Sequence, residues 1–398
     1  KYPEKNAKMK ELFCKIGSEA MIYLDNAATT RPAPCLGPLF SQYCADGWHN
    51  PSAMYFPAVQ AEQKIEEARS FLKGIVHAPE AIFTSCGTEG SNTVAFNGWK
   101  RHGAAKRHFI TSAYEHACVY ECFRALEQQG HRVDFVKPGK RGVITPEAVA
   151  SLVCEDTALV SIMHVNNETG AINDIAAIAE AVKTKNPDTM FFADGVQAFL
   201  RVPFSMSASK VDYYSVSAHK VHGLKGTGML FFRKGTPLKA YLLGGGQESA
   251  LRSGTENTFG ILAFAEASRA FLQDHAQKLA HMECLKTQLR DGLLSAKGAH
   301  CFTPDPSAPH ILNMAFEGMR GEVLLHLLER EGICISTGSA CSSKKRTFRI
   351  HESIGVRPEL AECAVRFSFC PDNTPEEIDY TIEKTKAALQ KFQGFIRR

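Results

Sequence analysis

One lysine in the sequence stands where a lysine could act as a nucleophile. Lys220 ends the segment Ser217-Ala-His-Lys220, which follows an apolar β-type run and precedes the glycine-containing residues 223–228. A lysine fixed at a strand end beside hydroxyl and imidazole donors suits Schiff-base chemistry, because the amine must be held and partly desolvated to react. The alternative is a solvated surface lysine. The spacing does not fit the P-loop pattern Gly-x-x-x-x-Gly-Lys-Ser/Thr.

An aspartate follows another apolar run. Asp194 lies in Ala193-Asp-Gly-Val-Gln197, 26 residues before Lys220. A carboxylate at a strand end can keep a pyridine nitrogen protonated, which is the arrangement that makes pyridoxal 5'-phosphate (PLP) an electron sink. Gln197 could then donate to the phenolate oxygen of that ring. The alternatives are a helix cap for Asp194 and a solvent-facing side chain for Gln197.

A third segment, Phe83-Thr-Ser-Cys-Gly-Thr-Glu89, joins a short strand to a helical stretch. Glycine and hydroxyl residues at a helix start favour anion binding, because free backbone N–H groups and the positive end of the helix dipole point at the same place. A capped helix start is the alternative. Together the three segments supply a phosphate cradle, a partner for a pyridine nitrogen and an imine-forming lysine, so we expect PLP as the cofactor.

These residues must be positioned by an α/β sheet. Apolar runs alternate with helical stretches, which predicts parallel βαβ units in an open sheet with ligands beyond the carboxyl ends of the strands. A surface helix is expected over residues 58–74 from its apolar spacing. The expected strands are 81–84, 108–111, 158–164, 190–193, 211–217 and 228–233, and the expected intervening helices are 91–101, 117–129 and 175–185.

The pattern changes after residue 260, where a long helical stretch (261–294) precedes fewer, mixed elements. We expect residues 1–20 to be an N-terminal extension or added residues, and residues 21–265 to be a large cofactor-binding domain whose first residues could pack with the small domain. Residues 266–398 are expected to form that small α+β domain, which carries Cys341. The expected fold class is therefore α/β, with a mostly parallel central sheet and a smaller α+β domain.

Composition limits the classes of partner. The 398 residues carry 46 basic and 42 acidic side chains, a balance of +4, whereas nucleic-acid binders more often show a strong basic excess. No apolar run approaches the ~18 residues of a membrane helix. The 13 cysteines include no Cys-x-x-Cys pair, so we expect no metal site, no disulfide framework and a reducing, cytoplasmic location, with most thiols as core filler.

Ten segments in order along the chain form a recognisable set. They are Tyr23-Leu-Asp-Asn-Ala-Ala-Thr-Thr30, Asn50-Pro-Ser52, Phe83–Glu89, Glu115-His116, His164-Val-Asn-Asn-Glu-Thr-Gly170, Ala193–Gln197, Ser217–Lys220, Arg252-Ser-Gly-Thr-Glu-Asn257, Ser336-Thr-Gly-Ser-Ala-Cys341 and Val365-Arg-Phe-Ser368. With these segments the sequence resembles a known family over about residues 23–391: the cysteine desulfurases of the class V aminotransferase-like group, PLP enzymes of fold type I. Residues that differ from the family include Gly195, where a slightly larger residue is usual, and Leu224, where proline is commoner.

The resemblance implies a role for each matching residue. Lys220 would hold the cofactor as an imine and move protons, and His116 would stack on the ring and assist acid–base steps. Asn167 and Arg366 would bind cofactor or substrate, with Arg366 clamping the carboxylate of the amino acid. The remaining cofactor contacts implied are Gly87, Thr88, Asp194, Gln197, Ser217, His219 and, from a neighbouring subunit, Thr255. A shared site of this kind implies a homodimer.

Cys341 matches the family's persulfide-forming cysteine, in the subgroup with the longer loop. The resemblance therefore implies an L-cysteine desulfurase that passes sulfur to an acceptor or scaffold protein, as in iron–sulfur cluster assembly or tRNA thiolation. A selenocysteine lyase and, at greater distance, a class V aminotransferase are the alternative enzymes. A catalytically silent scaffold subunit is the alternative from another class, and the intact Lys220, Asp194 and Cys341 argue against it.

Overall fold

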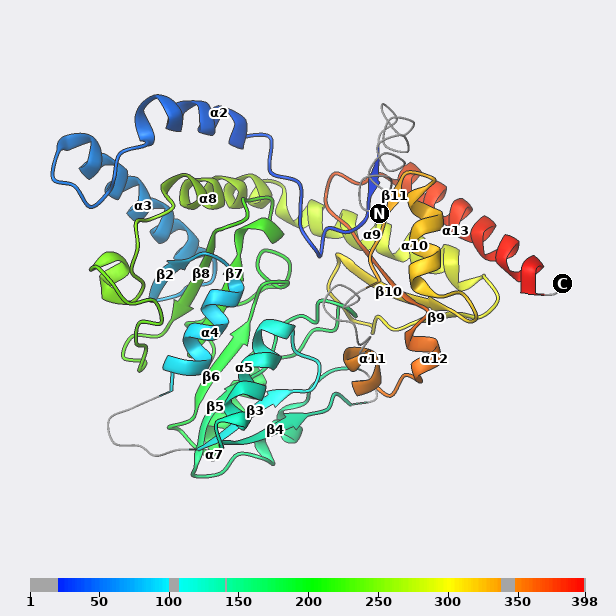
Figure 1. The fold of residues 1–398 in the computed structure, drawn as a ribbon, viewed down its shortest axis with the longest axis horizontal. Coiled ribbons are helices and arrows are strands. Elements are labelled where there is room, and N and C mark those ends of the chain that lie inside the picture. Colours follow the sequence, from blue (N-terminus) through cyan, green and yellow to red (C-terminus); the bar gives the residue numbers. More distant parts are fainter. Residues whose placement is uncertain (1–20, 100–106, 140–141, 338–347, 397–398) are drawn as a thin grey trace, which may run out of the picture.

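A seven-stranded sheet forms the centre of the molecule (Figure 1). The computed structural model describes residues 21–99, 107–139, 142–337 and 348–396. Within them the strand order is β2-β8-β7-β6-β5-β3-β4. The strands are β2 (Glu80–Thr84), β3 (His108–Ser112), β4 (Arg132–Val136), β5 (Thr157–Ser161), β6 (Met190–Asp194), β7 (Tyr213–Ser217) and β8 (Gly228–Phe232).

Six of these strands run in one direction and β8 runs against them. β8 pairs antiparallel with both β2 and β7, whereas the neighbours from β7 to β4 pair in parallel. The reversal follows from chain length, because only ten residues, with one short 3-10 turn over Ala218–Lys220, join β7 to β8. A parallel crossover needs about a dozen residues or more.

Helices cover both faces of the sheet. One core holds apolar side chains of α3 (Phe56–Ile75), α7 (Ile175–Lys185) and α8 (Thr258–Leu272), and the other holds those of α4 (Gly87–Asn97) and α5 (Ala117–Gln128). Because successive strand side chains point to opposite faces, neighbouring residues of β6 enter different cores: Phe191 the first and Phe192 the second. The short α6 (Pro146–Ala150) packs on α7, and α2 (Leu36–Gln42) packs on α8.

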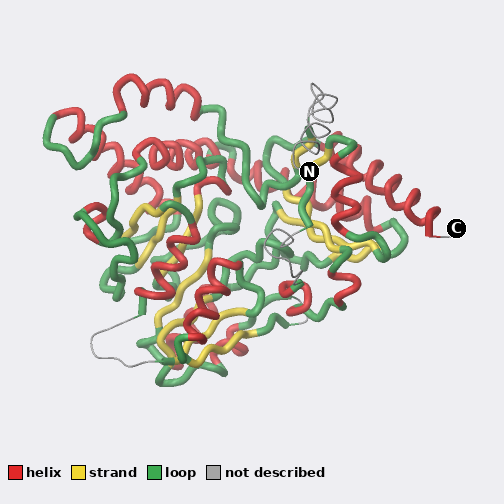
Figure 2. Tube along the Cα trace, viewed as in Figure 1, coloured by secondary structure: helices red, strands yellow, loops and turns green. Residues whose placement is uncertain are grey.

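A second group of elements follows along the chain. β10 (Ile311–Phe316) pairs antiparallel with β9 (Ala299–Cys301) and β12 (Ala364–Ser368). Figure 2 shows helices around the strands in both parts of the molecule. This second part contains α9 (His275–Leu294), α10 (Gly321–Glu329), α11 (Arg349–Ser353), α12 (Pro358–Ala361) and α13 (Pro375–Ile396). The two groups of elements support the proposal of two domains.

The first described strand joins this second group. β1 (Ile22–Tyr23) pairs in parallel with β11 (Ile333–Cys334), and the Asn26 side chain donates to the Ser368 carbonyl at 3.0 Å. The chain then passes back to the large sheet, where Thr30 N–H donates to the His219 carbonyl at 2.9 Å. Residues 24–30 therefore connect the two groups of elements directly beside Lys220.

The predicted fold class, a mostly parallel sheet with helices and a smaller α+β part, is confirmed. β8, one of the expected strands, is the antiparallel member of that sheet, and β4 is a strand that the sequence analysis did not predict. The helical stretch over 261–294 is divided between α8 and α9, where Asp274 takes a left-handed backbone conformation with φ 52°. No helix in the described residues combines the length and apolar content needed to span a membrane.

Candidate active site

A cavity of about 210 Å³ opens where the parallel strands of the large sheet end. The turns after β2, β3, β5, β6 and β7 all contribute to its wall, as expected for an open α/β sheet. It brings together nine of the predicted site residues: Gly87, Thr88, His116, Asn167, Asp194, Gln197, Ser217, His219 and Lys220. The sequence analysis did not single out five further lining residues: Cys86, Cys118, Met163, Val165 and Val196.

Lys220 is held at the end of the 3-10 turn that follows β7. Its Nζ donates to the carbonyls of Ala27 and Ala28, each at 2.6 Å. Burial lowers the pKa of this amine to about 8, and the positive charges of Arg366 and Arg201 act in the same direction. A larger fraction of Lys220 is therefore neutral, and nucleophilic, near neutral pH than for a lysine in water.

Asp194 ends β6 and is 5% exposed. Its Oδ1 accepts the Val196 N–H at 2.9 Å, which fixes the carboxylate at the floor of the cavity. Burial raises the pKa of Asp194, and His116 and Lys220 oppose that rise. Gln197 donates to the Ala27 carbonyl at 2.8 Å and pairs through Oε1 with His310, so its amide bridges the two groups of elements.

His116 lies in the turn between β3 and α5, where it caps the helix. Its Nδ1 accepts the backbone N–H of Cys118 at 3.2 Å and lies 3.0 Å from that residue's Sγ. Removal of water inside the cavity lowers the pKa of His116, as do the charges of Lys220, Arg349 and Arg366, whereas Asp194 raises it. The imidazole is therefore neutral at physiological pH and available as a proton acceptor.

One end of the cavity is suited to an anion. Gly87 and Thr88 begin α4, whose N-cap residue Cys86 makes no side-chain capping bond. A Cβ at position 87 would approach Val196 Cγ2 to 2.5 Å, so only glycine leaves room there. Ser217 Oγ is buried without a hydrogen-bond partner among the described residues. These groups can accept a phosphate in the way that a helix N-terminus does.

His219 lies beside these groups and lines the same cavity. Its Nδ1 lies 3.2 Å from Thr29 Oγ1. Burial lowers the pKa of His219 to about 4, with smaller effects of Lys220 and Lys225 in the same direction. The ring is therefore neutral at physiological pH and offers one N–H to an anion.

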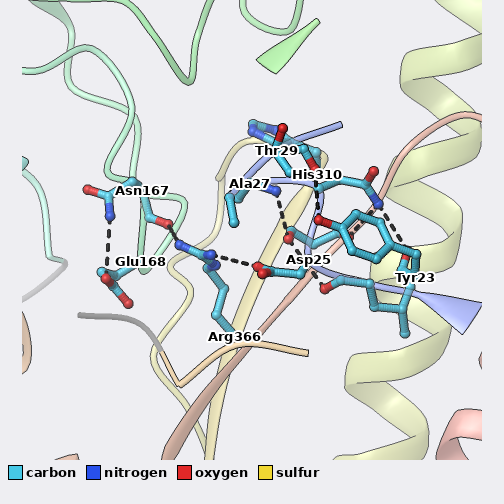
Figure 3. Close-up of polar contacts among 12 residues, drawn as sticks. Tyr23, Asp25, Ala27, Thr29, Asn167, Glu168, His310 and Arg366 are labelled. Atoms are coloured by element: carbon cyan, nitrogen blue, oxygen red, sulfur yellow. Dashed lines mark hydrogen bonds and ion pairs between the residues drawn. The ribbon is translucent and has the colours of Figure 1, made fainter. Parts of the chain in front are cut away.

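Arg366 approaches the site from β12 (Figure 3). Its Nη1 donates to the Asn167 carbonyl and its Nη2 to Asp25 Oδ1, each at 2.8 Å. The guanidinium is 5% exposed, and its Nε has no partner among the described residues. Figure 3 shows Asp25 and Asn167 on opposite sides of this guanidinium, which is thereby fixed next to the segment that lines the cavity.

One predicted residue lies elsewhere, and another is not described. Thr255 lines a separate cavity with Ser85 and Arg252. This placement does not test the prediction that Thr255 serves a neighbouring subunit. Cys341 lies outside the described residues, as does the basic segment 344–346.

The residues present fit PLP. The carboxylate of Asp194 and the amine of Lys220 line one cavity, and an anion-accepting helix start with the unpartnered Ser217 hydroxyl lies at its end. Gly87, Thr88, Ser217 and His219 would hold the phosphate. Asp194 would hold the pyridine nitrogen, and Lys220 would bind the aldehyde carbon.

Comparison with known proteins gives the same family. The aminotransferase class-V family model matches residues 22–381. A "NifS/IcsS protein homolog" of Lactobacillus delbrueckii subsp. bulgaricus is 40% identical over 379 residues, covering 94% of this chain and 98% of that protein. A protein named cysteine desulfurase IscS, from Pseudoalteromonas translucida, is 36% identical over 386 residues, covering 94% of this chain and 93% of its own.

Solved structures agree with these sequence matches. A structure titled NifS-like protein superposes with a TM-score of 0.87 at 36% identity and covers 93% of this chain and 100% of its own. The NifS-like protein of Rickettsia africae has a TM-score of 0.83 at 25% identity, with the same two coverages. The chain therefore belongs to the aminotransferase class-V family of enzymes and, within it, to the cysteine desulfurases.

Proposed function

We propose that this protein is a PLP-dependent L-cysteine desulfurase that converts L-cysteine to L-alanine and transfers the sulfur to Cys341. The observation that carries the proposal is the shared cavity of Lys220 and Asp194, with the lysine's pKa lowered to about 8. The names of the relatives at 34–40% identity support the same activity.

The cofactor, when bound, supplies an electron sink that labilises bonds at the amino-acid α-carbon. The chain's own residues orient the substrate and transfer protons. Lys220 Nζ, held by two carbonyls, is placed to take and return a proton, and His116 offers a neutral imidazole in the same cavity. Arg366, fixed between Asn167 and Asp25, is placed to bind a carboxylate with paired N–H groups.

Sulfur transfer balances without an added oxidant. The thiol of Cys341 takes the substrate sulfur to give a persulfide, and the substrate carbon gains a proton, so L-cysteine and one thiol become L-alanine and one persulfide. An acceptor or scaffold protein would then collect the sulfur. That acceptor, like the predicted cytoplasmic location, stays a prediction.

We also infer a homodimer. Large apolar side chains gather on the segment between α2 and the start of α3: Trp48 is 61% exposed, Met54 97% and Phe56 71%. Single exposed apolar residues are ordinary, but a contiguous set is typical of an interface. The predicted contact of Thr255 with the cofactor of a neighbouring subunit also requires a second copy of the chain.

The test is the yield of alanine and sulfide from L-cysteine with excess thiol reductant, using the purified PLP-loaded protein. Equal yields over many turnovers are expected. In Cys341→Ala, PLP and cysteine binding should persist while persulfide and sulfide turnover are lost. Full sulfide release by that variant would overturn the role of Cys341.

The same assay separates the alternatives. Turnover of selenocysteine by both the parent chain and Cys341→Ala, with no turnover of cysteine by the parent chain, would indicate a selenocysteine lyase. Accumulation of pyridoxamine phosphate that depends on a keto acid would indicate an aminotransferase. Either result would replace the proposed activity.

A further inference from the structure

Three side chains at the floor of the cavity place one ligand atom each around a small common space. Cys118 Sγ lies 3.0 Å from His116 Nδ1 and 3.8 Å from Asp194 Oδ2. The ligand atoms of all three residues lie within 4.8 Å of one another. The proposed desulfuration uses His116 and Asp194 but gives no task to the Cys118 thiol.

The fold fixes these positions at the ends of β3 and β6, which lie on either side of β5 in the large sheet. His116 is the N-cap of α5 and Cys118 stands in the first turn of that helix, so the His-x-Cys spacing places both side chains at the helix start. Asp194 is the last residue of β6, and its Oδ1 is already taken by the Val196 N–H. The remaining oxygen, Oδ2, is the one near Cys118.

Imidazole, thiolate and carboxylate are the three side-chain ligands that zinc prefers. Their bonds to zinc measure about 2.0–2.3 Å, which separates tetrahedral ligand atoms by about 3.4–3.6 Å. The two Cys118 separations, 3.0 and 3.8 Å, bracket that range, and all three ligand atoms lie within 4.8 Å of one another, so movements of the side chains alone can bring them to tetrahedral spacing. We propose that, in the cofactor-free chain, His116, Cys118 and Asp194 form a site for Zn²⁺ or a similar borderline metal ion.

Neighbouring groups support such a site. Ser91 Oγ lies 3.5 Å from Cys118 Sγ, and its hydroxyl can donate to a thiolate in place of its present acceptor, the Gly87 carbonyl at 3.0 Å. The Val196 N–H holds the carboxylate in place, as second-shell donors do at metal sites. Binding replaces the thiol proton, which leaves to solvent, and weakens the 3.2 Å contact between the Cys118 N–H and Nδ1. The cavity leaves the fourth position open to water.

Metal and cofactor exclude each other in this arrangement. This mutual exclusion rests on the proposed function, which assigns Asp194 and His116 to the cofactor ring. The same Asp194 oxygen cannot bind a metal and a pyridine nitrogen together. The site would therefore hold metal only before the cofactor is loaded, and PLP would displace it.

Cobalt(II) is the probe, because its bond to a thiolate gives a charge-transfer absorption. The PLP-free full-length chain carrying Cys14→Ala and Cys341→Ala is titrated with Co²⁺ and then with Zn²⁺ in competition, so that neither thiol outside the described residues can be the ligand. We expect the charge-transfer band, loss of the band on adding Zn²⁺, and loss of the cobalt d–d bands on adding PLP. Cys118→Ala in this background should lack the band and bind Zn²⁺ at least about tenfold more weakly.

Cys86→Ala is the matched control, because Cys86 lines the same cavity outside the cluster and its removal should leave the band intact. Cys118→Ser keeps the volume of the side chain and should also lose the band, and its circular dichroism spectrum shows whether it folds. A parent chain without the band, a band that survives in Cys118→Ser, or cobalt that stays bound alongside PLP would each overturn the proposal. Desulfuration by the PLP-loaded wild-type chain is measured separately, so failure of the proposed function is recognised by itself.

Discussion

The guanidinium of Arg366 and the carboxylate of Asp25 form an ion pair of 2.8 Å beside the cavity. The two charges act on Lys220 in opposite directions: Arg366 lowers the pKa of the lysine and Asp25 raises it. The pair therefore does more than orient the arginine. It also adjusts the pKa of Lys220, which burial lowers most.

Removing the charge of Asp25 and removing the charge of Arg366 should shift the pKa of Lys220 in opposite directions. Asp25→Asn is expected to lower the pKa of Lys220 below its value of about 8, and Arg366→Gln to raise it, each by roughly half a unit or more. Competitive acetylation of the cofactor-free chain across pH 6–11, read by peptide mass spectrometry, measures this pKa. Shifts of the same sign in both variants would contradict the argument.

Glu115 should make stability depend on pH. It is fully buried, and burial raises its pKa from 4.5 to about 8 despite hydrogen bonds from Ser112 and Met163. Between those values the folded chain holds a proton that the unfolded chain has lost. Stability from this group is therefore fully present below about pH 4.5 and falls as pH rises to about 8, by ~1.4 kcal/mol per pH unit.

Glu115→Gln keeps the shape of the side chain and removes that titration. The difference in unfolding free energy between variant and parent, from urea unfolding at pH 5, 6, 7 and 8, should move in favour of the variant as pH rises. Parallel stability curves for the two proteins would show that Glu115 does not hold the proton.

The Tyr214 ring occupies the space that a side chain at Gly195 would need. A Cβ at position 195 would lie 2.0 Å from Tyr214 Cζ, and the tyrosine ring is fully buried, stacked on Phe204 and hydrogen-bonded to His164. Gly195→Ala should therefore destabilise the protein by about 1–3 kcal/mol. A leucine at position 214 frees that space. In chemical unfolding, the double variant Gly195→Ala/Tyr214→Leu should therefore lose less unfolding free energy than the two single variants together. If the losses of unfolding free energy were additive, the two positions would not share this space.

The exposed apolar surface before α3 should carry the subunit contact. Phe56→Glu places a charge on that surface and should shift the protein from dimer to monomer in sedimentation velocity. Tyr380→Glu on α13 is the control, since Tyr380 is also exposed, at 37%, and Figure 1 shows α13 at the opposite end of the molecule from α3. A Phe56→Glu variant that remains dimeric would place the interface elsewhere.

Much of the site could be predicted from the sequence because its residues follow strand ends. Lys220, Asp194 and Gly87 each come within three residues of an apolar run, and parallel strands bring such positions to one edge of a sheet. The contacts within residues 24–30 could not be predicted. No periodicity indicates that the carbonyls of Ala27 and Ala28 accept from Lys220, since those bonds join parts of the chain more than 190 residues apart.

Cys118 illustrates a second limit. The sequence analysis predicts that most cysteines are core filler and does not single out Cys118, which lines the cavity 3.8 Å from Asp194. The spacing His116-x-Cys118 is the available sequence signal for this cluster. The third residue, Asp194, lies on a strand 76 residues after Cys118. The direction of β8 was predictable in principle, because the ten-residue connection from β7 is too short for a crossover.

The ion pair between Asp25 and Arg366 joins residues 341 positions apart, and Asn26 meets Ser368 in the same region. A ribosome must therefore synthesise nearly the whole chain before the substrate end of the site can form, although every strand of the large sheet is complete by residue 232. Such long-range contacts close slowly because the loop entropy is lost first. During synthesis, the large sheet can fold well before Arg366 reaches Asp25, so we expect the nascent protein to pass through a stage with Lys220 and the proposed phosphate site but without the proposed carboxylate-binding arginine.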